Sequence, residues 1–406
     1  MEVYRYNVTN LELKVPGSDL ITIDKSRILD MELIKDYDNY FFPIFRISIN
    51  MQLQDIYTLR KYNNDAKIHL RMTRIPYDPE SNFNPETVII NKMFTPIMED
   101  ITPDLEAKLN SLTQEDTSNE LLNYKSKIEL YLVDYDAINS SKTLINTILN
   151  NTDITTALTY TFQKSGLRNV LMSKVDNIKK YDQIIIPPGT MIQTIMNLEK
   201  MYGIFKTYST LFFDYGTTYL LDKKGSSTAQ RFNEKIRVTF KIFSDDDNRT
   251  FVCGTEETKL GYNINVSRNA LSIDENSSSN DAILGSNFIN IDLNSGVIND
   301  IESNVDGVNG KTNYRFTVSN YDNPYIELCE KHGIEESAKG IYIGLRDYDF
   351  DAITPNKEFI ISFDNTQLSL EHSGIYRMSL QRILFSKEGE IFRSTGSIFL
   401  KRAKQK

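Results

Sequence analysis

The sequence predicts an α+β protein dominated by antiparallel β-sheet, with a helical insert in the middle of the chain. Two observations support this fold class. Segments near both ends alternate apolar and polar residues, which is the two-residue period of a sheet with one solvated face. Residues 141–222 show instead the three- to four-residue apolar spacing of helices. The 406 residues are enough for two or three domains.

The first predicted unit near the N-terminus is a strand, a short helix and a second strand. Residues 45–53 place an apolar side chain at every odd position and a polar one at every even position. Apolar residues three apart follow over 56–62, which predicts a helix. Residues 63–65 end it, because Asn and Asp accept turn conformations. Alternation returns over 67–73, so a second strand is expected there.

A long loop excursion is expected over residues 76–118, where five prolines interrupt the pattern. It is expected to contain at most one strand, over 87–93, and one polar helix near 104–112. A further strand is predicted over 127–133. These elements form a predicted first domain of residues 1–140.

The middle of the chain is predicted to be a compact α+β insert of residues 141–222. Asp153 is a good first residue for a helix and Gly166 a good last one, because an Asp side chain accepts from free N–H groups and Gly adopts the conformation that ends helices. The expected elements are helices at 141–150, 153–164 and 190–202, and strands at 204–213 and 217–221.

Strands return in a predicted second domain of residues 223–406. They are expected at 235–243, 250–254, 263–268, 359–363, 375–385 and 391–400. Two polar stretches, 274–281 and 294–311, contain too few apolar residues to pack and are predicted to be mobile loops.

The order strand, helix, strand recurs late in the chain. Residues 312–319 alternate, Pro324 opens a short helical stretch to Lys331, and 341–345 is again strand-like. One interpretation is a duplication of the first unit, and the other is coincidence in a mixed protein. Three copies of a chain with two similar sheet domains would offer a pseudo-sixfold ring.

Bulk charge and cysteine content exclude several classes. The net charge is −9, and no Lys/Arg cluster dominates apart from the tail at 401–406, so tight nucleic-acid binding is disfavoured. An acidic surface would still let DNA slide past. Cys253 and Cys329 are far apart and are expected to be reduced, partly buried thiols. No long apolar run or signal peptide is recognisable, so cytoplasmic synthesis without stable membrane insertion is expected.

The sequence contains none of the common catalytic or cofactor-binding motifs. His69, His332 and His372 are scattered, and no HExxH, P-loop, GxSxG or GxGxxG motif occurs. A glycosidase would need a carboxylate pair across a cleft, and the sequence singles out none. We therefore expect no enzyme and no cofactor.

One acidic stretch is a weak candidate for a metal site. Asp347, Asp349 and Asp351 are spaced two apart, and carboxylate oxygens are the ligands that Ca²⁺ prefers. The stretch lacks the Gly and the later Glu of an EF-hand loop.

Polar residues on the predicted strands are candidates for contact with a neighbouring subunit or with a central lumen, where charge pairs would set the register. The alternative is that these faces are simply solvated. The candidates are Arg46, Ser48, Asn50, His69, Arg71, Arg237, Lys241, Arg377 and Arg393.

Several local motifs resemble phage tail baseplate hub proteins. The runs Ile184–Thr190 (IIIPPGT), Lys200–Phe205 (KMYGIF) and Ser209–Asp214 (STLFFD) resemble the helix start, helix stop and aromatic strand of the hub insert. The run Asn39–Pro43 (NYFFP), leading into an Ile/Arg/Ser strand, is similar to the start of the first tube domain. The similarity covers about half of the chain, in pattern more than in invariant residues.

The resemblance implies two tail-tube-like β-barrel or sandwich domains with the α+β insert between them. It also implies a homotrimeric ring that joins the hexameric tail tube protein to a trimeric central spike or tail-tip protein, with DNA passing only in transit. The protein would be made in a bacterial cytoplasm and reside in the virion tail. Two alternatives stay open: a β-rich tail component that binds cell wall or carbohydrate, and a wall-degrading hydrolase.

Overall fold

The computed structural model defines most of the chain. It describes residues 3–17, 20–62, 65–77, 85–98, 103–111, 124–223, 229–243, 254–275, 287–292, 298–302, 312–317, 323–326, 329, 339–363, 372 and 374–404. No helix in these ranges is both long enough and apolar enough to cross a membrane.

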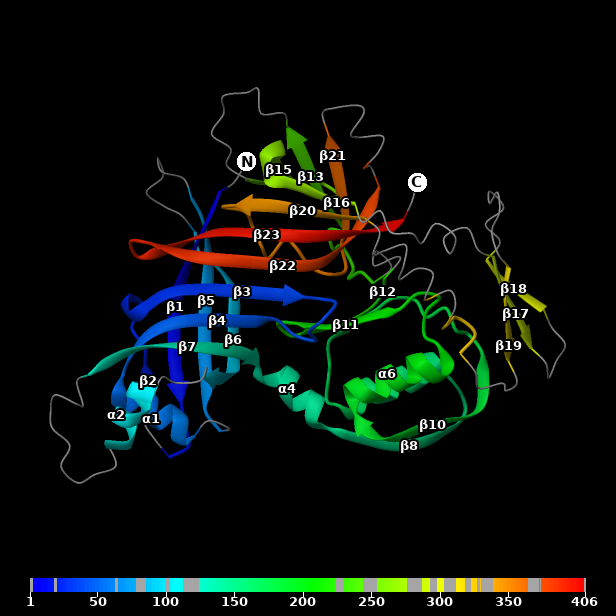
Figure 1. Cartoon of the computed structure of the whole chain (residues 1–406), viewed down its shortest axis with the longest axis horizontal. Coiled ribbons are helices and arrows are strands. Elements are labelled where there is room, and N and C mark those ends of the chain that lie inside the picture. The colour runs from blue at the N-terminus through cyan, green and yellow to red at the C-terminus, as the bar shows by residue number, and fades with distance from the viewer. Residues whose placement is uncertain are drawn as a thin grey trace.

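Within the described residues, eight strands close into a β-barrel (Figure 1). Their order around the barrel is β22-β3-β4-β7-β6-β5-β1-β23, and the pairing of β22 with β23 closes the ring. The strands are β1 (Tyr4–Lys14), β3 (Ile28–Asp36), β4 (Ile44–Gln52), β5 (Lys67–Pro76), β6 (Thr87–Met98), β7 (Lys125–Asp134), β22 (Ile375–Glu388) and β23 (Ile391–Lys404). All neighbours in this ring are antiparallel, and the short β2 (Ile21–Thr22) pairs with β1.

The interior of this barrel is filled by side chains. Tyr6, Phe45, Phe94 and Phe385 are fully buried in one apolar cluster, and Tyr6 and Phe45 both contact Phe385. Eight strands leave a space that side chains can just fill. Each buried aromatic or aliphatic side chain contributes roughly 1.5–3 kcal/mol. The barrel is therefore a packed core and has no channel through it.

Six more strands attach to the same closing hairpin. The series β14 (Thr255–Glu257), β15 (Gly261–Ser267), β13 (Arg237–Phe243) and β21 (Glu358–Phe363) leads to β22, while β16 (Leu271–Glu275) and β20 (Lys339–Arg346) lead to β23. In Figure 1, β13 and β21 point upward above the hairpin, while β20, β22 and β23 run across the view. These strands and the shared hairpin form a second, sandwich-like unit.

The hairpin β22–β23 is the common wall of both units. The sequence assigned residues 375–404 to the second domain, and the structure shows that they also close the first barrel. The predicted fold class is confirmed: the chain is mainly antiparallel sheet with a β-barrel and an α+β insert. The domain boundaries after 140 and 222 stay predictions.

Two short helices close one end of the barrel. Helix α1 (Leu53–Lys61) buries Leu53, Ile56 and Leu59. The sequence pattern predicted the apolar positions 56 and 59, but it placed Leu53 in the preceding strand. Helix α2 (Pro103–Ser111) corresponds to the predicted polar helix in the loop excursion. The strand predicted in that excursion is β6, which is longer than expected and is a full member of the barrel.

The insert has its own core. After α4 (Tyr135–Lys142), it contains β8 (Leu144–Asp153), α5 (Ile154–Lys164), β9 (Val170–Met172), β10 (Lys180–Thr190), α6 (Met191–Tyr202), β11 (Ser209–Asp214) and β12 (Thr217–Asp222). Asp153 caps α5 through Thr156 N at 2.8 Å, and Thr190 and Gln193 form a capping box on α6. Gly203, at φ 74°, ends α6.

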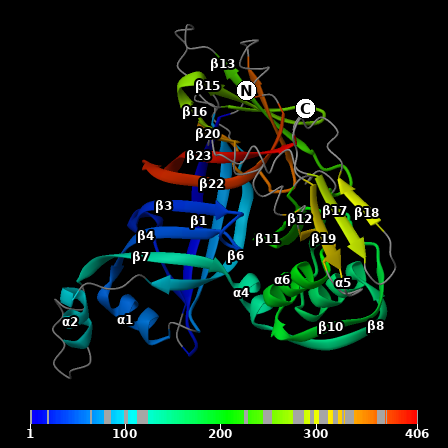
Figure 2. The same cartoon turned by 45° about the vertical axis from the view of Figure 1, so that its right-hand side comes forward.

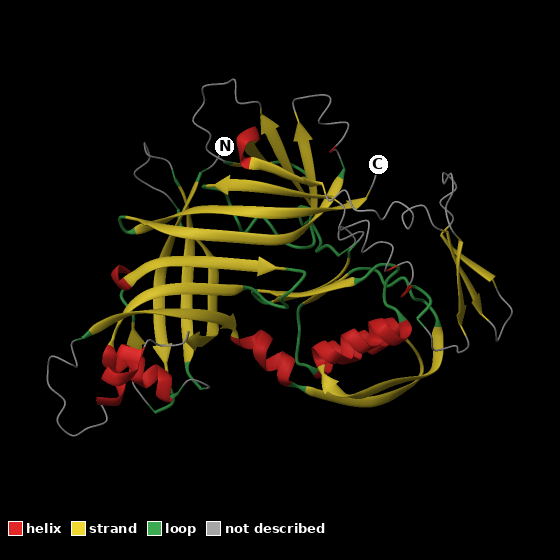
Figure 3. Ribbon diagram, viewed as in Figure 1, coloured by secondary structure: helices red, strands yellow, loops and turns green. Residues whose placement is uncertain are grey.

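The helix predicted over 141–150 is wrong. Leu144, Ile145, Ile148 and Leu149 have the spacing of a helix face, yet the segment forms strand β8, paired with β10. As a strand it turns Ile145 inward and leaves Leu144 and Ile148 outward. The apolar residues are thus divided between two faces of a sheet. Figure 3 shows this two-stranded ribbon, formed by β8 and β10, below the helices of the insert.

A separate sheet is formed by β17 (Asn287–Asp292), β18 (Ile298–Glu302) and β19 (Thr312–Thr317), seen beside the insert in Figure 2. The predicted repeat is not one unit of the structure, because β19 pairs with β17 while β20 lies in the large sheet. The predicted loop at 294–311 contains β18. Of 274–281, all but the end of β16 lies outside the described residues, as do Cys253 and nearly all of the predicted strand at 250–254.

Candidate functional site

An ion-pair cluster fastens the N-terminal strand to the C-terminal strands. Asp347 follows β20 at φ 58°, a conformation that Asp accepts more readily than most residues. Its buried carboxylate accepts from Arg5 of β1 at 2.7 Å and from Arg393 of β23 at 2.9 and 2.7 Å. We call these three residues the Asp347 cluster.

The next turn is held against the first barrel by further bonds. The Tyr6 hydroxyl donates to the carbonyl of Tyr348 at 2.6 Å, and burial raises the pKa of Tyr6 well above its usual value. Arg74 of β5 forms an ion pair with Asp349. The segment after β20 therefore connects the two sheet units.

This arrangement gives no support to the candidate calcium site. The carboxylates of Asp347 and Asp349 are bound by arginines, and Asp351 is exposed. Among the residues that the structure describes, no three His, Cys, Asp or Glu side chains lie close enough together to hold a metal ion.

A second cluster lies where β3 ends. Asp38 accepts from Arg377 of β22 at 3.1 Å, from Lys401 of β23 at 2.8 Å, and from Ser379, while Lys223 lies 3.7 Å away. Burial alone would raise the pKa of Asp38, but Arg377, Lys401 and Ser379 more than offset it and hold the pKa far below its usual value. We call these five residues the Asp38 cluster.

The Asp38 cluster predicts a pH dependence of stability. Because the pKa of Asp38 is lower in the folded chain than the unfolded value of about 3.9, its stabilisation is complete above that value and is lost as the pH falls below it. Asp38→Asn should lower the free energy of unfolding by about 2–3 kcal/mol at pH 7. The difference from wild type should narrow as the pH falls from about 4 to about 3, because Asp38 then binds a proton in the unfolded chain but not in the folded one.

Urea denaturation at a series of pH values measures this difference. Glu106→Gln, which removes an exposed ion pair with Arg60, is the control and should cost less than about 0.5 kcal/mol at each pH. A difference for Asp38→Asn that stays constant down to pH 3 contradicts the assignment.

A buried ion pair joins the insert to the first barrel. Lys35 of β3 contacts Asp214 at the end of β11 at 2.8 Å, and both are almost fully buried. Beside it, the backbone N–H of Phe213 donates to the carbonyl of Phe41 at 2.7 Å, within the Asn39–Pro43 region. The insert is therefore firmly seated on the barrel.

The outer face of the barrel carries a ladder of paired charges. Arg46 of β4 contacts Glu32 and Glu129 at 3.1 Å and Asp30 at 3.3 Å, and Arg382 of β22 pairs with Glu32. Burial would lower the pKa of Arg46, but the three carboxylates raise it above its usual value. The ladder crosses four strands, and its arginines are neutralised.

The nine candidate interface residues lie in different parts of the structure. Arg377 and Arg393 belong to the two clusters described above and lie inside the chain's own fold. The others lie on strand faces: Arg46, Ser48 and Asn50 on β4, His69 and Arg71 on β5, and Arg237 and Lys241 on β13. Ser48 is fully buried. Whether the exposed members meet a neighbour or a lumen stays a prediction.

Most of these polar residues already have partners. His69 Nε2 lies 2.8 Å from Asn91 Oδ1, and its Nδ1 lies near Asn10 and Glu12. Arg237 pairs with Glu358 at 3.3 Å, and Lys241 with Glu256 at 3.7 Å. Paired side chains of this kind stabilise by little individually, about 0–1 kcal/mol each.

The comparison with known families covers almost the whole chain. The family model described as "Bacteriophage PBS1 gene 109 protein" matches residues 6–403. The chain belongs to this family. No curated protein sequence matches this chain significantly.

The fold of this chain is similar to that of a solved tail protein. It is similar to the tail protein from Neisseria meningitidis MC58, with a TM-score of 0.51 at 9% identity over 98% of this chain and 96% of that one. The 43 kDa tail protein of prophage MuSo2 from Shewanella oneidensis gives a TM-score of 0.47 at 10% identity, with 96% of each chain covered. The resemblance to phage tail proteins drawn from the sequence is confirmed at the level of family and fold.

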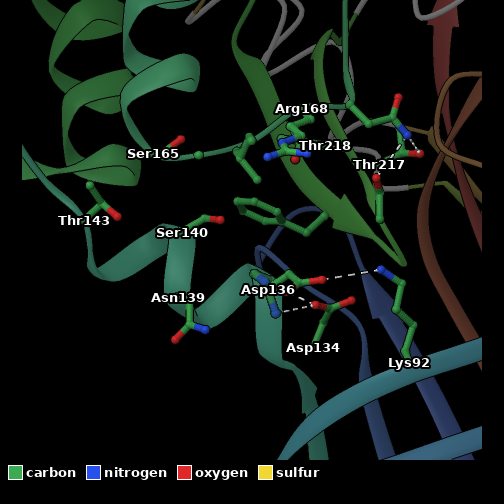
Figure 4. A pocket seen from close by; sticks show the side chains of 16 residues that line it. Lys92, Asp134, Asp136, Asn139, Ser140, Thr143, Ser165, Arg168, Thr217 and Thr218 are labelled. Atoms are coloured by element: carbon green, nitrogen blue, oxygen red, sulfur yellow. Dashed lines mark hydrogen bonds and ion pairs between the residues drawn. The ribbon is translucent and has the colours of Figure 1, made fainter.

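The structure also has a cleft lined mainly by polar residues, which the sequence did not predict. The cleft has a volume of about 570 Å³ and lies between α4, the loop at 165–169 and the β11–β12 turn (Figure 4). Lys92 lies 3.6 Å from Asp136, and Asp134 caps α4 through two backbone N–H groups at 2.9 and 3.2 Å. Its charges are of mixed sign and come from the barrel as well as the insert, so this cleft marks the joint between them.

Proposed function

We propose that this protein is the baseplate hub of a phage tail, in which three copies form a ring. The single observation that carries the proposal is the shared hairpin β22–β23. It holds two sheet units side by side in one chain. Three copies would then present six sheet units, two from each chain, around a threefold axis.

This arrangement is suited to matching two symmetries. A hexameric tail tube protein would meet six sheet units, and a trimeric central spike or tail-tip protein would meet three identical chains. Because both units share hydrogen-bonded strands, they cannot change their separation without breaking the hairpin. The ring would therefore be stiff, as a joint under load requires.

DNA would pass along the ring axis between the copies. The first barrel is filled with side chains and offers no passage of its own. The chain carries a net charge of −9, and the arginines of the outer-face ladder are paired with carboxylates. Tight DNA binding depends on unpaired cations that displace counterions from phosphates. A wall of this kind would let DNA slide during ejection. The protein would be made in the host cytoplasm and reside in the virion tail.

Native mass spectrometry of the full chain, alone and with the tail tube protein of the same phage, tests the proposal. The expected species is three times the chain mass of 46.8 kDa, followed by a complex with six tube subunits. A stable monomer that does not bind the tube protein overturns the hub. If the chain instead clears a cell-wall suspension, the hydrolase alternative replaces it.

A further inference from the structure

The ribbon formed by β8 and β10 has one covered face and one open face. Helices α5 and α6 lie on the covered face, where Ile145, Ile184 and Ile186 are buried. On the open face, Leu144, Ile148 and Ile185 are 77%, 57% and 51% exposed, and Ile148 lies directly opposite Ile185. A group of large, exposed aliphatic side chains marks a surface that another protein covers in the assembled particle.

The open face carries no charge. The other exposed side chains around these three residues, Asn146, Asn150, Gln183 and Pro187, are also neutral, and the charged Lys180, Asp182 and Asp153 lie at the end of the ribbon away from Leu144. Residues 144–152 contain no charged residue at all, in a chain with 25% charged residues. A partner that covers this face must therefore be uncharged as well, because a charge placed against it would lose its hydration and gain no counter-charge.

The free edge of β8 offers unpaired backbone groups. The N–H of Ile185 donates to the Tyr202 hydroxyl at 3.2 Å and hence does not pair with β8. Antiparallel pairs alternate between bonded and non-bonded, so the pair Ile148–Ile185 is non-bonded and Ile148 directs its N–H and C=O away from β10. By the same alternation, Asn146 and Asn150 do so too. In the described part of the chain, no other strand pairs with this edge.

The two edges of the ribbon differ in protection. Strand β10 contains Pro187 and Pro188, a register irregularity between Ile186 and Gly189, and the charged residues Lys180 and Asp182. These features prevent a further strand from adding. Strand β8 has no proline and no charged residue before Asp153, and its first backbone irregularity in φ is at Asn151. An edge without proline or charge from Leu144 to Asn150, next to one that is well protected, indicates that β8 is covered in the assembled particle.

We propose that an extended, uncharged segment of a partner protein adds to β8 as a third strand. Its main chain would bond to Asn146, Ile148 and Asn150, and its apolar side chains would cover Leu144, Ile148 and Ile185. This mode of recognition takes affinity from backbone hydrogen bonds and specificity from alternate side chains. Pairing of β8 with β8 of a second copy is not the arrangement, because it creates a twofold axis, which the proposed threefold ring lacks. In this respect the inference rests on the proposed function.

Hydrogen exchange read by mass spectrometry tests the strand addition. In the free full-length chain, the amides of Asn146, Ile148 and Asn150 should exchange at least about 100-fold faster than those of Thr147 and Leu149, which face β10. In intact tails, the three amides should slow by at least about 100-fold. Exchange that is unchanged in tails overturns the proposal. Protection already present in the isolated oligomer also overturns it, since the occupant would then be a second copy.

Two variants distinguish the contribution of the backbone N–H of Ile148 from that of its side chain. Ile148→Pro removes the outward N–H at a position where an edge strand tolerates proline, because that N–H is not bonded to β10. Protection of Asn146 and Asn150 in tails should be lost. Ile148→Thr keeps the N–H and the β-branched shape, and protection should persist. If Ile148→Pro weakens protection of Thr147, and so damages the ribbon itself, Asn146→Pro replaces it as the test.

Native mass spectrometry tests the trimeric ring separately from the strand addition. A trimeric Ile148→Pro variant that no longer gains protection supports both proposals. Wild-type protein that gains protection in tails but is not trimeric contradicts the hub and leaves the strand addition standing. A trimer with no protected edge contradicts the strand addition alone.

Discussion

Gly396→Ala is expected to unfold both sheet units together, at a cost of at least about 3 kcal/mol. Gly396 lies in β23 opposite Ile383 of β22. A Cβ at this position would lie 2.3 Å from the carbonyl oxygen of Arg382 and 3.2 Å from the Cα of Ile383. Both atoms belong to the backbone of the shared hairpin, so neither can move without breaking hydrogen bonds that serve both units. Thermal denaturation followed by circular dichroism measures the loss.

Gly344→Ala is the matched control for this prediction. Gly344 lies in the adjacent strand β20, and a Cβ there would make an ordinary contact of 3.4 Å with the Cβ of Ala270. Replacing a strand glycine by alanine restricts the unfolded chain, so the control should change stability by no more than about 1 kcal/mol. Equal effects of the two substitutions would contradict the claim that the hairpin is the common wall.

Asp347→Asn is expected to lower the free energy of unfolding by about 3–5 kcal/mol. Asparagine keeps the size of the side chain and accepts the φ of 58°, so the substitution removes the charge and replaces one accepting oxygen by an NH2 group, which cannot accept from the arginines. Arg5 is 6% exposed and would lose its buried counter-charge, with only the exposed Glu388 left nearby at 3.1 Å. Chemical denaturation measures the cost.

A second substitution in the same cluster tests the cause. The double variant Arg5→Met with Asp347→Asn should recover part of the loss, because no buried arginine is then left without a partner. Glu390→Gln, which removes an exposed ion pair with Lys25, should cost less than about 0.5 kcal/mol. A loss below about 1 kcal/mol for Asp347→Asn would show that the cluster does not hold the two units together.

Strands with regular alternation were predictable from the sequence. The segments that became β4, β5 and β7 show an unbroken two-residue period, and helix α1 shows its own spacing, so their identity follows from local pattern. Strand β1 was missed because a register shift between Val8 and Asn10 breaks the alternation in mid-strand. Strand β8 was misassigned because its apolar residues lie on both faces.

The polar clusters could not be predicted from local pattern. Arg5 and Asp347 are 342 positions apart, and Lys35 and Asp214 are 179 apart. Nothing in the neighbouring sequence indicates which arginine meets which carboxylate. The spacing of Asp347, Asp349 and Asp351 pointed instead to a metal site, because it was interpreted without the arginines that the fold brings to it.

The sequence by itself determined the fold class and the resemblance to tail proteins. Those features depend on hydrophobic period and on turn and capping residues, which act over a few positions. The tertiary structure decided that β22 and β23 serve both units, that the outer-face charges are paired, and that β8 has an open edge. These features depend on which strands become neighbours, and that choice is made by packing across hundreds of residues rather than by any local preference.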